Sequence, residues 1–437
     1  MKYLILAFAF YYQNLLFSFV YSYEFVPEIF EFLFITSLVF FMARFKLRKL
    51  IYILWQLLYT VQFCFYGYFN SWIISYDIKL FYTHINETFE SIIVLLSYFS
   101  VAISTGIIII LFILSNHFKS IIINKFILFI IIIFTFSNTK INDVSLLLIK
   151  ELPYTFTFVD SKINNNIPEH KLIKETNQSI VLILGESHRA KEYLDHNFSF
   201  FQNNYQSIYS AATNTDVSLP LFFNGIENIE QINTTNNLFK LAKQNHYKTF
   251  FISSQKQSYL KYIEPFVEKK FIDEYQILSS QNDYHLIDKI KKIDLSKKSF
   301  VVLQMQGVHS PYIYHNETQS DNIKEQYYKC YQKSNNVLEQ LKKVVNKNAI
   351  IIFTSDHGEN LGENNKYGHN RFSPEIYKVP LVILNDKNKT EILSHYELYL
   401  HIVKQLGYDI SKIKKKQKIR VYGTMINGED GFRDFLR

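Results

Sequence analysis

The N-terminal third of the chain carries a series of long apolar runs, and these runs constrain the fold more than any other feature. From Leu4 to Tyr23 the sequence holds no charged residue at all. A membrane-crossing helix needs about 20 predominantly apolar residues. We therefore predict five membrane spans, at Tyr3–Tyr21, Phe30–Ala43, Ile51–Asn70, Ile92–Ser115 and Ile121–Phe136. Buried core helices are the alternative, but so many long uncharged runs in series favour a membrane domain.

The charges of the predicted loops indicate how the spans are oriented. The first loop carries Glu24 and Glu28, whereas basic residues gather in the second and fourth loops: Arg44, Lys46, Arg48, Lys49, Lys119 and Lys125. Basic loops stay on the cytoplasmic side, so we expect a cytoplasmic N-terminus and, after five spans, a C-terminal domain on the outer face. Four spans would place that domain in the cytoplasm, so the short fifth run decides its side. No small-residue cleavage site follows the first run, which we interpret as a retained span.

Composition separates this membrane domain from a polar remainder. The chain of 437 residues has a net charge of +8, and its mean hydropathy of -0.03 averages two unlike parts. We assign residues 1–140 to the transmembrane domain, 141–178 to a bridging segment at the membrane surface and 179–437 to a soluble domain. The basic charge suits contact with anionic lipid headgroups, and without a nucleic-acid motif we expect no nucleic-acid partner. Cys64 and Cys330 fall in different domains, so no disulfide is expected.

The soluble part alternates strand-like and helix-like stretches. Stretches such as Tyr327–Val345 and Ser394–Leu406 have helical spacing. Five apolar runs are expected to be strands: "SIVLIL" (179–184), "KTFFIS" (248–253), "SFVVLQM" (299–305), "AIIIFTS" (349–355) and "VPLVIL" (379–384). Near-continuous apolar strands alternating with helices are typical of a mostly parallel sheet that is covered on both faces. We therefore predict an α/β domain.

Candidate metal ligands follow three of these strands, at the place where an α/β sheet binds its ligands. Glu186 follows the first run, His309 follows the third, and Asp356 and His357 follow the fourth, with His369 further along in "KYGHN". Each alone would be a solvated loop residue, and "SDHGE" alone would be an Asx-type turn. Carboxylates and imidazoles at successive strand ends are ligands suited to Zn²⁺ or Mn²⁺. Taken together, they predict a metal site.

The segment "YSAATNTDVSLPLFF" offers hydroxyl groups to such a site. Thr213, Thr215 and Ser218 are the candidates. A hydroxyl is a weak nucleophile at neutral pH, but a bound metal lowers its pKa and polarises a phosphoryl oxygen. Composition alone favours the alternative of a Ser/Thr-rich loop whose side chains bond to their own backbone. The residues by themselves leave the nucleophile open.

Four motifs in order resemble one known family. "VLILGES", "ATNTDVSLP", "GVHSPY" and "FTSDHGENLGENNKYGHN", behind five predicted spans, are similar to motifs of the bacterial phosphoethanolamine transferases. These are inner-membrane enzymes of the alkaline phosphatase/sulfatase superfamily. The match covers residues 180–384, and the span pattern extends it to most of the chain. It implies a five-helix membrane domain followed by a periplasmic, sulfatase-like α/β domain.

The resemblance also implies a metal centre and a nucleophile. Glu186, Asp356 and His357 would bind one zinc ion tightly, with manganese as the less favoured metal. Thr215 matches the second threonine of the pattern T-x-T-x-x-S-x-P. It would complete the zinc site and take phosphoethanolamine from phosphatidylethanolamine as a covalent intermediate.

Further residues would bind the substrates. His309 and His369 would hold the transferred phosphate, bind a second metal ion or move protons. Asn86 and Glu90, in "HINETFES" of the third loop, would help to bind the lipid headgroup. The resemblance implies a membrane-bound enzyme, which we expect to be a monomer, that transfers the group to lipopolysaccharide or another envelope glycan.

The acceptor and the donor each have an alternative. Relatives that modify lipid A often have disulfide-linked cysteines where this chain has Ala211 and Leu221, which favours a core sugar as the acceptor over lipid A. A phosphoglycerol transferase of the same topology and a catalytically inactive membrane scaffold are the other interpretations. A sulfatase is not expected, because Phe222 stands where the Ser-x-Pro-x-Arg motif of its nucleophile has arginine.

Overall fold

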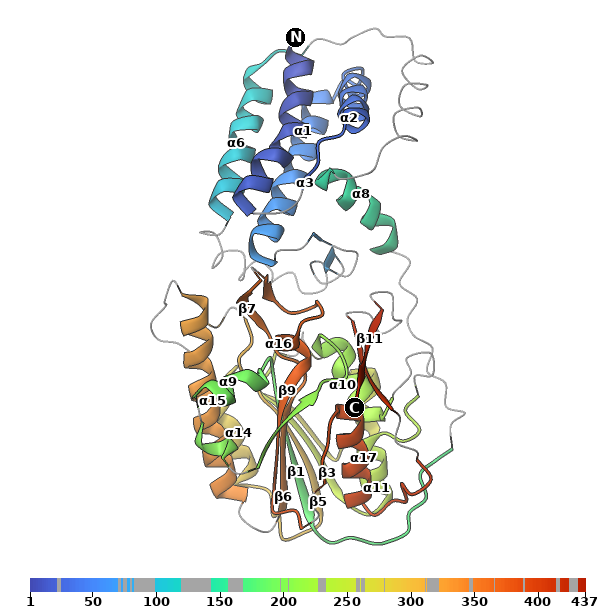
Figure 1. The fold of residues 1–437 in the computed structure, drawn as a ribbon. Coiled ribbons are helices and arrows are strands. Elements are labelled where there is room, and N and C mark those ends of the chain that lie inside the picture. The colour runs from blue at the N-terminus through green and yellow to red at the C-terminus, as the bar shows by residue number, and fades with distance from the viewer. Residues whose placement is uncertain are drawn as a thin grey trace. The chain divides into compact units, whose positions relative to one another are not determined.

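The chain forms two compact units, which Figure 1 shows as ribbons. The computed structural model describes residues 1–21, 25–69, 72–73, 77–78, 81, 99–118, 143–155, 168–196, 198–202, 204–226, 233–256, 260, 264–278, 280–310, 312, 322–345, 349–364, 366–387, 390–413, 417–423 and 431–437. The first unit is Met1–Phe158 with Asn364–Tyr367, and the second is Val159–Glu363 with Gly368–Arg437. The predicted division at residues 140 and 178 stays a prediction.

The first unit is helical. Its helices are α1 (Lys2–Tyr21), α2 (Ile29–Met42), α3 (Arg48–Phe69), α6 (Ser100–Ser115) and α8 (Val144–Thr155). Aromatic side chains join them: the rings of Phe17 on α1 and Phe63 on α3 stack with centroids 3.8 Å apart. Buried aromatic rings make a large share of the contact area in such a bundle.

The described helices test only part of the predicted membrane topology. Two of them, Lys2–Tyr21 and Arg48–Gly67, are long and apolar enough to cross a membrane. The helices at the second and fourth predicted spans have 14 and 16 residues, fewer than the roughly 20 that a span needs. The fifth predicted span, residues 121–136, lies outside the described residues, as does the beginning of the fourth. The N-terminal helical region is thus confirmed, and the five spans and their orientation stay predictions.

A buried carboxylate joins α8 to the other helices of this unit. Asp143 precedes α8, and its Oδ1 accepts the N–H groups of Ser145 and Leu146 at 3.0 and 3.2 Å. These are donors that a helix N-terminus leaves free. Its Oδ2 accepts the hydroxyl of Tyr59 and the side-chain amide of Asn14 at 2.5 and 2.8 Å. One side chain thus caps α8 and ties it to α1 and α3.

The second unit is built on a seven-stranded sheet of order β2-β9-β6-β1-β5-β3-β4. Its strands are β1 (Ser179–Gly185), β2 (Tyr205–Tyr209), β3 (Lys248–Ser253), β4 (Glu274–Ile277), β5 (Ser299–Gln304), β6 (Ala349–Ser355) and β9 (Lys378–Leu384). Five neighbouring strands, β6 to β4 in this order, are parallel. Strand β9 pairs antiparallel with β6, and β2 pairs antiparallel with β9. The predicted α/β domain with a mostly parallel sheet is confirmed, and all five predicted strands are present.

Helices cover both faces of this sheet. Figure 1 shows α14 (Tyr284–Ile290) and α15 (Ile323–Val345) on one face, and α10 (Thr215–Asn224), α11 (Leu238–Gln244) and α17 (His395–Gln405) on the other. The side chains of Leu182, Phe239 and Ile402, from β1, α11 and α17, are fully buried in one core cluster. The predicted helices at residues 327–345 and 394–406 correspond to α15 and α17.

Short elements complete the fold, and one of them, β8 (Lys366–Gly368), begins in the segment Asn364–Tyr367 of the first unit. They are α9 (Ala190–His196), η2 (Ser199–Phe201), α13 (Glu264–Val267), η4 (Lys269–Phe271), α16 (Pro374–Tyr377), the hairpin β7 (Asn360–Glu363) and β8 (Lys366–Gly368), and the hairpin β10 (Lys418–Tyr422) and β11 (Phe432–Leu436). None of these short elements was predicted from the sequence. Runs of three to seven residues are too short for hydrophobic periodicity to distinguish them from loops.

The strand register brings four strand ends to one edge of the sheet. Gly185, the last residue of β1, pairs with Ser355, the last residue of β6. Gln304, the last residue of β5, pairs with Leu184 of β1 and with Ser253 of β3. The chain therefore leaves β3, β5, β1 and β6 side by side at their carboxyl ends. Such an edge is where an open α/β sheet binds its ligand.

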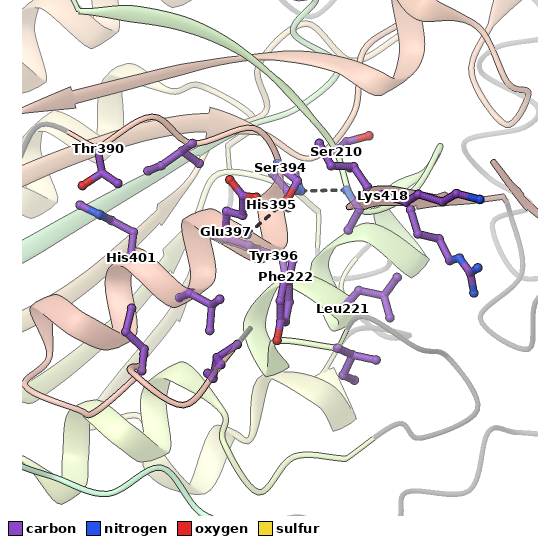
Figure 2. Close-up of a pocket in the computed structure, with 18 of the residues that line it drawn as sticks. Ser210, Leu221, Phe222, Thr390, Ser394, His395, Tyr396, Glu397, His401 and Lys418 are labelled. Carbon is purple, nitrogen blue, oxygen red and sulfur yellow. Dashed lines mark hydrogen bonds between the residues drawn. The ribbon is translucent and has the colours of Figure 1, made fainter. Parts of the chain in front are cut away.

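A cavity of about 160 Å³ lies beside α10 and α17, and Figure 2 shows its lining. Leu221 and Phe222 of α10 form part of its apolar wall. His395 lines it as well, and its Nδ1 accepts the backbone N–H of Ala211 at 3.1 Å. Burial lowers the pKa of His395 to about 3, so its ring is neutral and able to accept this hydrogen bond. The ring thereby supports the segment that leads into α10.

Candidate metal centre

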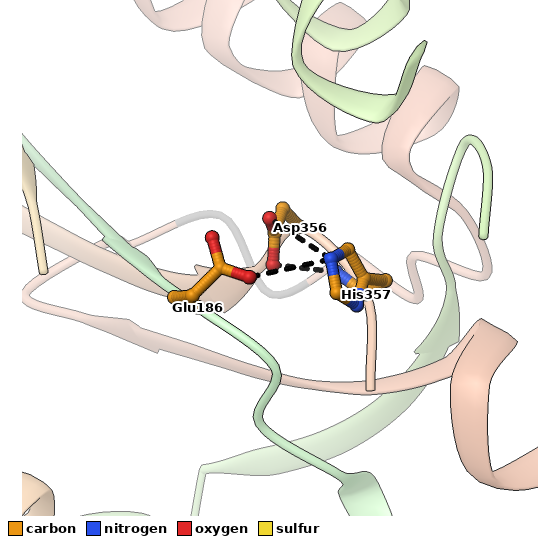
Figure 3. A group of neighbouring side chains, drawn as sticks. All are labelled: Glu186, Asp356 and His357. Carbon is orange, nitrogen blue, oxygen red and sulfur yellow. Dashed lines mark hydrogen bonds and ion pairs between the residues drawn. The ribbon is translucent and has the colours of Figure 1, made fainter. Parts of the chain in front are cut away.

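Three predicted ligands meet at the carboxyl edge of the sheet. Glu186 directly follows β1, and Asp356 and His357 directly follow the neighbouring strand β6. Each offers a ligand atom, and these atoms all lie within 4.8 Å of one another. His357 Nε2 is 3.3 Å from Glu186 Oε1 and 3.5 Å from Asp356 Oδ2. Figure 3 shows how the three side chains point toward one another. All three side chains are at most 2% exposed.

Asp356 serves the turn and the site at once. Its Oδ1 accepts the backbone N–H groups of His357 and Ser187, at 2.7 and 3.2 Å. This is the local bonding expected of an Asx-type turn. Its Oδ2 instead faces the other candidate ligands. The turn and the metal ligand are therefore compatible descriptions of one residue, because each uses a different oxygen.

The residue after Asp356 and His357 is Gly358, and its surroundings leave no room for a side chain. A Cβ atom at that position would lie 2.1 Å from the carbonyl oxygen of Glu375, far inside van der Waals contact. The backbone N–H of Gly358 donates to the carbonyl of Ile376 at 2.7 Å. The glycine therefore lets α16 pack directly against the loop that carries Asp356 and His357.

Thr215 places its hydroxyl beside all three ligands. It is the first residue of α10, whose N-cap Asn214 accepts the N–H of Val217 at 3.2 Å. Thr215 Oγ1 lies 2.7 Å from Asp356 Oδ2, 3.2 Å from Glu186 Oε2 and 3.2 Å from His357 Nε2. A capped helix N-terminus therefore presents this hydroxyl, and it also favours an anion bound next to it.

The other two candidate hydroxyls point elsewhere. Ser218 donates to the backbone carbonyl of Asp356 at 2.6 Å, so it holds the ligand loop rather than facing the ligands. Thr213 is fully buried, and its Oγ1 has no hydrogen-bond partner among the described residues. Of the three hydroxyls that the sequence left open, the structure brings only that of Thr215 to the ligand group.

The electrostatics of the group suit a bound cation. Burial, and then the charge of Glu186, raises the pKa of Asp356 to about 8. Burial alone would lower the pKa of His357, but both carboxylates outweigh it and raise that pKa to about 10. Two buried carboxylates in contact cannot both ionise without a compensating charge. Two carboxylates, one imidazole and one hydroxyl form a donor set that fits zinc, and a divalent cation would replace the protons that the group otherwise holds.

We expect the metal-free protein to lose stability as the pH rises from about 5 to about 8. In the unfolded chain Asp356 and His357 lose their protons near 3.8 and 6.5, but in the folded protein they keep them to about 8 and about 10. The pKa of Glu186 is lowered, chiefly by His357 acting against burial, so Glu186 is ionised in both states over this range. The folded state thus binds more protons, and each extra proton costs about 1.4 kcal/mol of stability per pH unit.

Thermal unfolding of the chelator-treated full-length protein across this range measures the effect. The zinc-loaded protein is the control and should show a weaker pH dependence, because the metal has displaced the protons. An unfolding midpoint of the metal-free protein that rises with pH would contradict the assigned protonation.

The two remaining histidines lie close to the group. The ring centroid of His369 is 4.4 Å from that of His357, and His369 Nδ1 is 3.4 Å from the buried carboxylate of Glu359. Burial lowers the pKa of His309, and the charges of Glu186 and His369 also act on it. Both rings are therefore placed beside the ligands, on the loops after β5 and β8. The predicted headgroup residues Asn86 and Glu90 lie outside the described residues.

Supporting residues around the group were missed in the sequence. Glu359 stands two residues after His357 in the same motif, so the motif itself was a signal for it.

Gln255 follows β3, whose carboxyl end lies at the same edge as those of β1 and β5. Gly307 has φ of +61°, and a Cβ there would lie 2.7 Å from the backbone of Glu186, so this loop packs directly against the ligand. Inspecting all five strand ends would have identified Gln255.

Arg189 supports the site from the other side. Its buried guanidinium is paired with Glu192 at 3.4 Å and with Glu363, at the end of β7, at 3.0 Å. Its backbone carbonyl accepts the hydroxyl of Tyr331 on α15 at 3.1 Å. The loop after β1 is thereby tied to α15 and to the hairpin that precedes His369.

Comparisons with known proteins identify others that share this architecture. A family model described as Sulfatase matches residues 178–408. An integral membrane lipooligosaccharide phosphoethanolamine transferase from Neisseria meningitidis has a similar structure, with a TM-score of 0.52 and 13% identity over 95% of each chain. At this identity the similarity concerns the fold, which extends through both units of the chain.

Two periplasmic domains are also similar in structure. That of a phosphoethanolamine transferase from Campylobacter jejuni is 20% identical, with a TM-score of 0.44, over 54% of this chain and 91% of its own. That of a protein from Escherichia coli, in complex with zinc, is 16% identical, with a TM-score of 0.49, over 61% of this chain and 94% of its own. No curated protein matches the chain in a sequence comparison.

Proposed function

The chain belongs to the sulfatase family, and from this premise we propose that it is a membrane phosphoethanolamine transferase. The observation that carries the proposal is the position of Thr215. Its hydroxyl lies within 3.2 Å of one atom of each of three buried, convergent metal-type ligands. A fold shared over 95% of the chain with a membrane-integral phosphoethanolamine transferase supports the same reaction.

The metal in this proposal is one zinc ion held by Glu186, Asp356, His357 and Thr215. When bound, zinc supplies positive charge that lowers the pKa of a hydroxyl and stabilises the nonbridging oxygens of a phosphoryl group. Manganese is the less favoured metal, because a set that includes an imidazole and is fully buried suits zinc better. His309 and His369 would hold the second ion of a two-metal site.

Thr215 acts as the nucleophile in the first half of the reaction. Its Oγ1 forms a bond to the phosphorus of phosphatidylethanolamine while the bond from phosphorus to the diacylglycerol oxygen breaks. In the metal-loaded site, where Asp356 would be ionised, the proton of the Thr215 hydroxyl passes to Asp356 Oδ2, which accepts its hydrogen bond at 2.7 Å. The diacylglycerol oxygen takes a proton from His309 or His369. A covalent phospho-threonine splits one difficult displacement into two easier ones.

The second half returns the enzyme to its starting state. A hydroxyl of the acceptor forms a bond to phosphorus and gives its proton to the histidine that protonated the diacylglycerol oxygen. The bond from phosphorus to Thr215 breaks, and Thr215 takes back the proton that it gave to Asp356. His309 and His369 hold the phosphate oxygens in both halves. Asn86 and Glu90 are proposed to bind the ethanolamine headgroup, and a core sugar of lipopolysaccharide is proposed as the acceptor ahead of lipid A.

The proposed setting is the bacterial inner membrane, with a cytoplasmic N-terminus and the catalytic domain in the periplasm. A lipid donor requires a catalytic domain attached to the membrane, and the N-terminal apolar helices supply that attachment. We propose a monomer, because one chain contains the complete ligand set.

Hydrolysis of sulfate esters is disfavoured for this member of the family. The sulfatase nucleophile derives from a Cys or Ser in a motif with arginine four residues on, and Phe222 stands at that position after Ser218. Ser218 also donates its hydroxyl to the backbone of Asp356. Thr215, not Ser218, is the hydroxyl beside the ligands.

Mass spectrometry of envelope glycolipids tests the proposal. Cells in which the gene is deleted should lose a phosphoethanolamine increment, and restoring the wild-type gene should return it, on the glycolipid that is the acceptor. A phosphoglycerol increment that follows the gene in the same way would support the phosphoglycerol transferase instead. An envelope profile that is identical with and without the expressed protein would overturn transferase activity altogether.

A further inference from the structure

Gln255 contacts the candidate ligand Glu186 directly. It lies two residues beyond the end of β3 and is 1% exposed. Its Nε2 donates to Glu186 Oε2 at 2.9 Å and to the backbone carbonyl of Met305 at 3.0 Å. Its Oε1 accepts the Nε2 of Gln304 at 3.0 Å. The amide thus bridges the loops that follow β3, β5 and β1.

The orientation of this amide is determined by its partners. A carboxylate oxygen and a carbonyl oxygen are both acceptors, so the atom that faces them must be the NH₂ group. On the other side, Gln304 presents a donor to the carbonyl oxygen. A flipped amide would put oxygen against two acceptors and nitrogen against a donor. The side chain therefore has one favourable orientation, in which it donates to Glu186.

The rest of Glu186 is held by other contacts. Its backbone packs against Gly307, where no side chain fits. Its Oε1 accepts the hydroxyl of Ser187 at 3.1 Å and faces His357. Among the described residues outside the ligand group, Gln255 is the donor that meets Oε2, the oxygen that also lies 3.2 Å from Thr215. A bond from a neutral donor to a carboxylate is stronger than one between neutral groups.

We propose that Gln255 is a positioning residue for the metal centre, which holds the Glu186 carboxylate in the rotation that binds zinc beside Thr215. This inference rests on the proposed function, because it presupposes that Glu186 is a zinc ligand. Partners that hydrogen-bond a metal ligand orient it, and their loss typically weakens metal binding about 10- to 100-fold. A purely structural role, as a strap between Met305 and Gln304, would leave zinc affinity unchanged.

The test is the zinc affinity of the full-length protein in detergent, measured by competition with a chromophoric chelator. Gln255→Met keeps the length of the side chain and removes its donor. Gln255→Asn keeps the amide but shortens it by one methylene, so it no longer reaches Glu186. Gln276→Met is the matched control: it lies on β4, beside Ile252 of β3 in the register, and its Oε1 has no hydrogen-bond partner among the described residues.

Both Gln255 variants should raise the zinc dissociation constant about 10- to 100-fold, while Gln276→Met stays near the wild-type value. If Gln255→Met fails to fold, Gln255→Asn carries the same test. Folded Gln255 variants that bind zinc within about twofold of wild type would overturn the positioning role and leave the proposed function intact. A wild-type protein that binds no zinc would instead overturn the metal centre of the proposed function.

Discussion

Thr215→Ala should reduce phosphoethanolamine transfer by on the order of 10⁴-fold or more, since removing a nucleophile removes the covalent route altogether. The physical reason is that neither of the other two candidate hydroxyls faces the ligand group: Ser218 is bonded to the backbone of Asp356, and Thr213 Oγ1 has no hydrogen-bond partner among the described residues. The measurement is turnover of a fluorescent phosphatidylethanolamine by the full-length protein in detergent or nanodiscs. Because Thr215 is itself a proposed ligand, the assay is run with zinc in excess.

Two variants control this result. Thr215→Ser keeps a hydroxyl at the same position and should retain a measurable part of the activity. Thr213→Ala removes the neighbouring threonine of the same motif and should keep turnover within about tenfold of wild type, because only stability is affected. Turnover that survives Thr215→Ala and is lost in Thr213→Ala would show that the wrong threonine has been assigned.

Asp356→Ala should weaken zinc binding strongly and abolish transfer. Its carboxylate belongs to the three buried side chains that could hold a metal ion, and it also accepts the hydrogen bond of Thr215 at 2.7 Å. A protein zinc site is worth about 10 kcal/mol or more. Losing one of the four proposed ligands should remove roughly a quarter of it, on the order of 10²-fold or more in affinity. Elemental analysis of the purified full-length protein gives the zinc content, and the fluorescent lipid assay gives the rate.

Asp195→Ala is the matched control for this variant. Asp195 lies on α9 with 49% of its side chain exposed, in an ion pair of 3.9 Å with Lys191, and exposed pairs of this kind contribute little. Its substitution should leave zinc content and turnover unchanged. An Asp356→Ala protein that keeps full zinc content would contradict the ligand set and, with it, the reading of the family motifs.

The strands that were predicted from the sequence are those whose own residues are mostly apolar. Strands β1, β3, β5, β6 and β9 are mostly apolar runs of six or seven residues, because strands that are buried on both faces need apolar side chains on both. Edge strands β2 and β4 have five and four residues and are only partly buried, so their composition does not distinguish them from loops. The sequence of β9 also does not show that this strand runs antiparallel to β6. A parallel and an antiparallel strand can present the same apolar face to their neighbours.

The sequence by itself determined which residue types follow the central strands, and hence that Glu186, Asp356 and His357 were candidates for one site. The carboxyl ends of parallel strands lie at the same edge of a sheet. Residues that follow two such strands therefore lie close together whenever the strands are neighbours, whatever the order of the other strands. The resemblance to a known family already implied Thr215 as the hydroxyl that joins them, but only the tertiary structure brings its side chain to Glu186 and places Gln255 on the same carboxylate. Thr215 and Gln255 are 29 and 69 residues from Glu186, and contacts over such distances depend on how helix α10 and strand β3 pack, which no local pattern encodes.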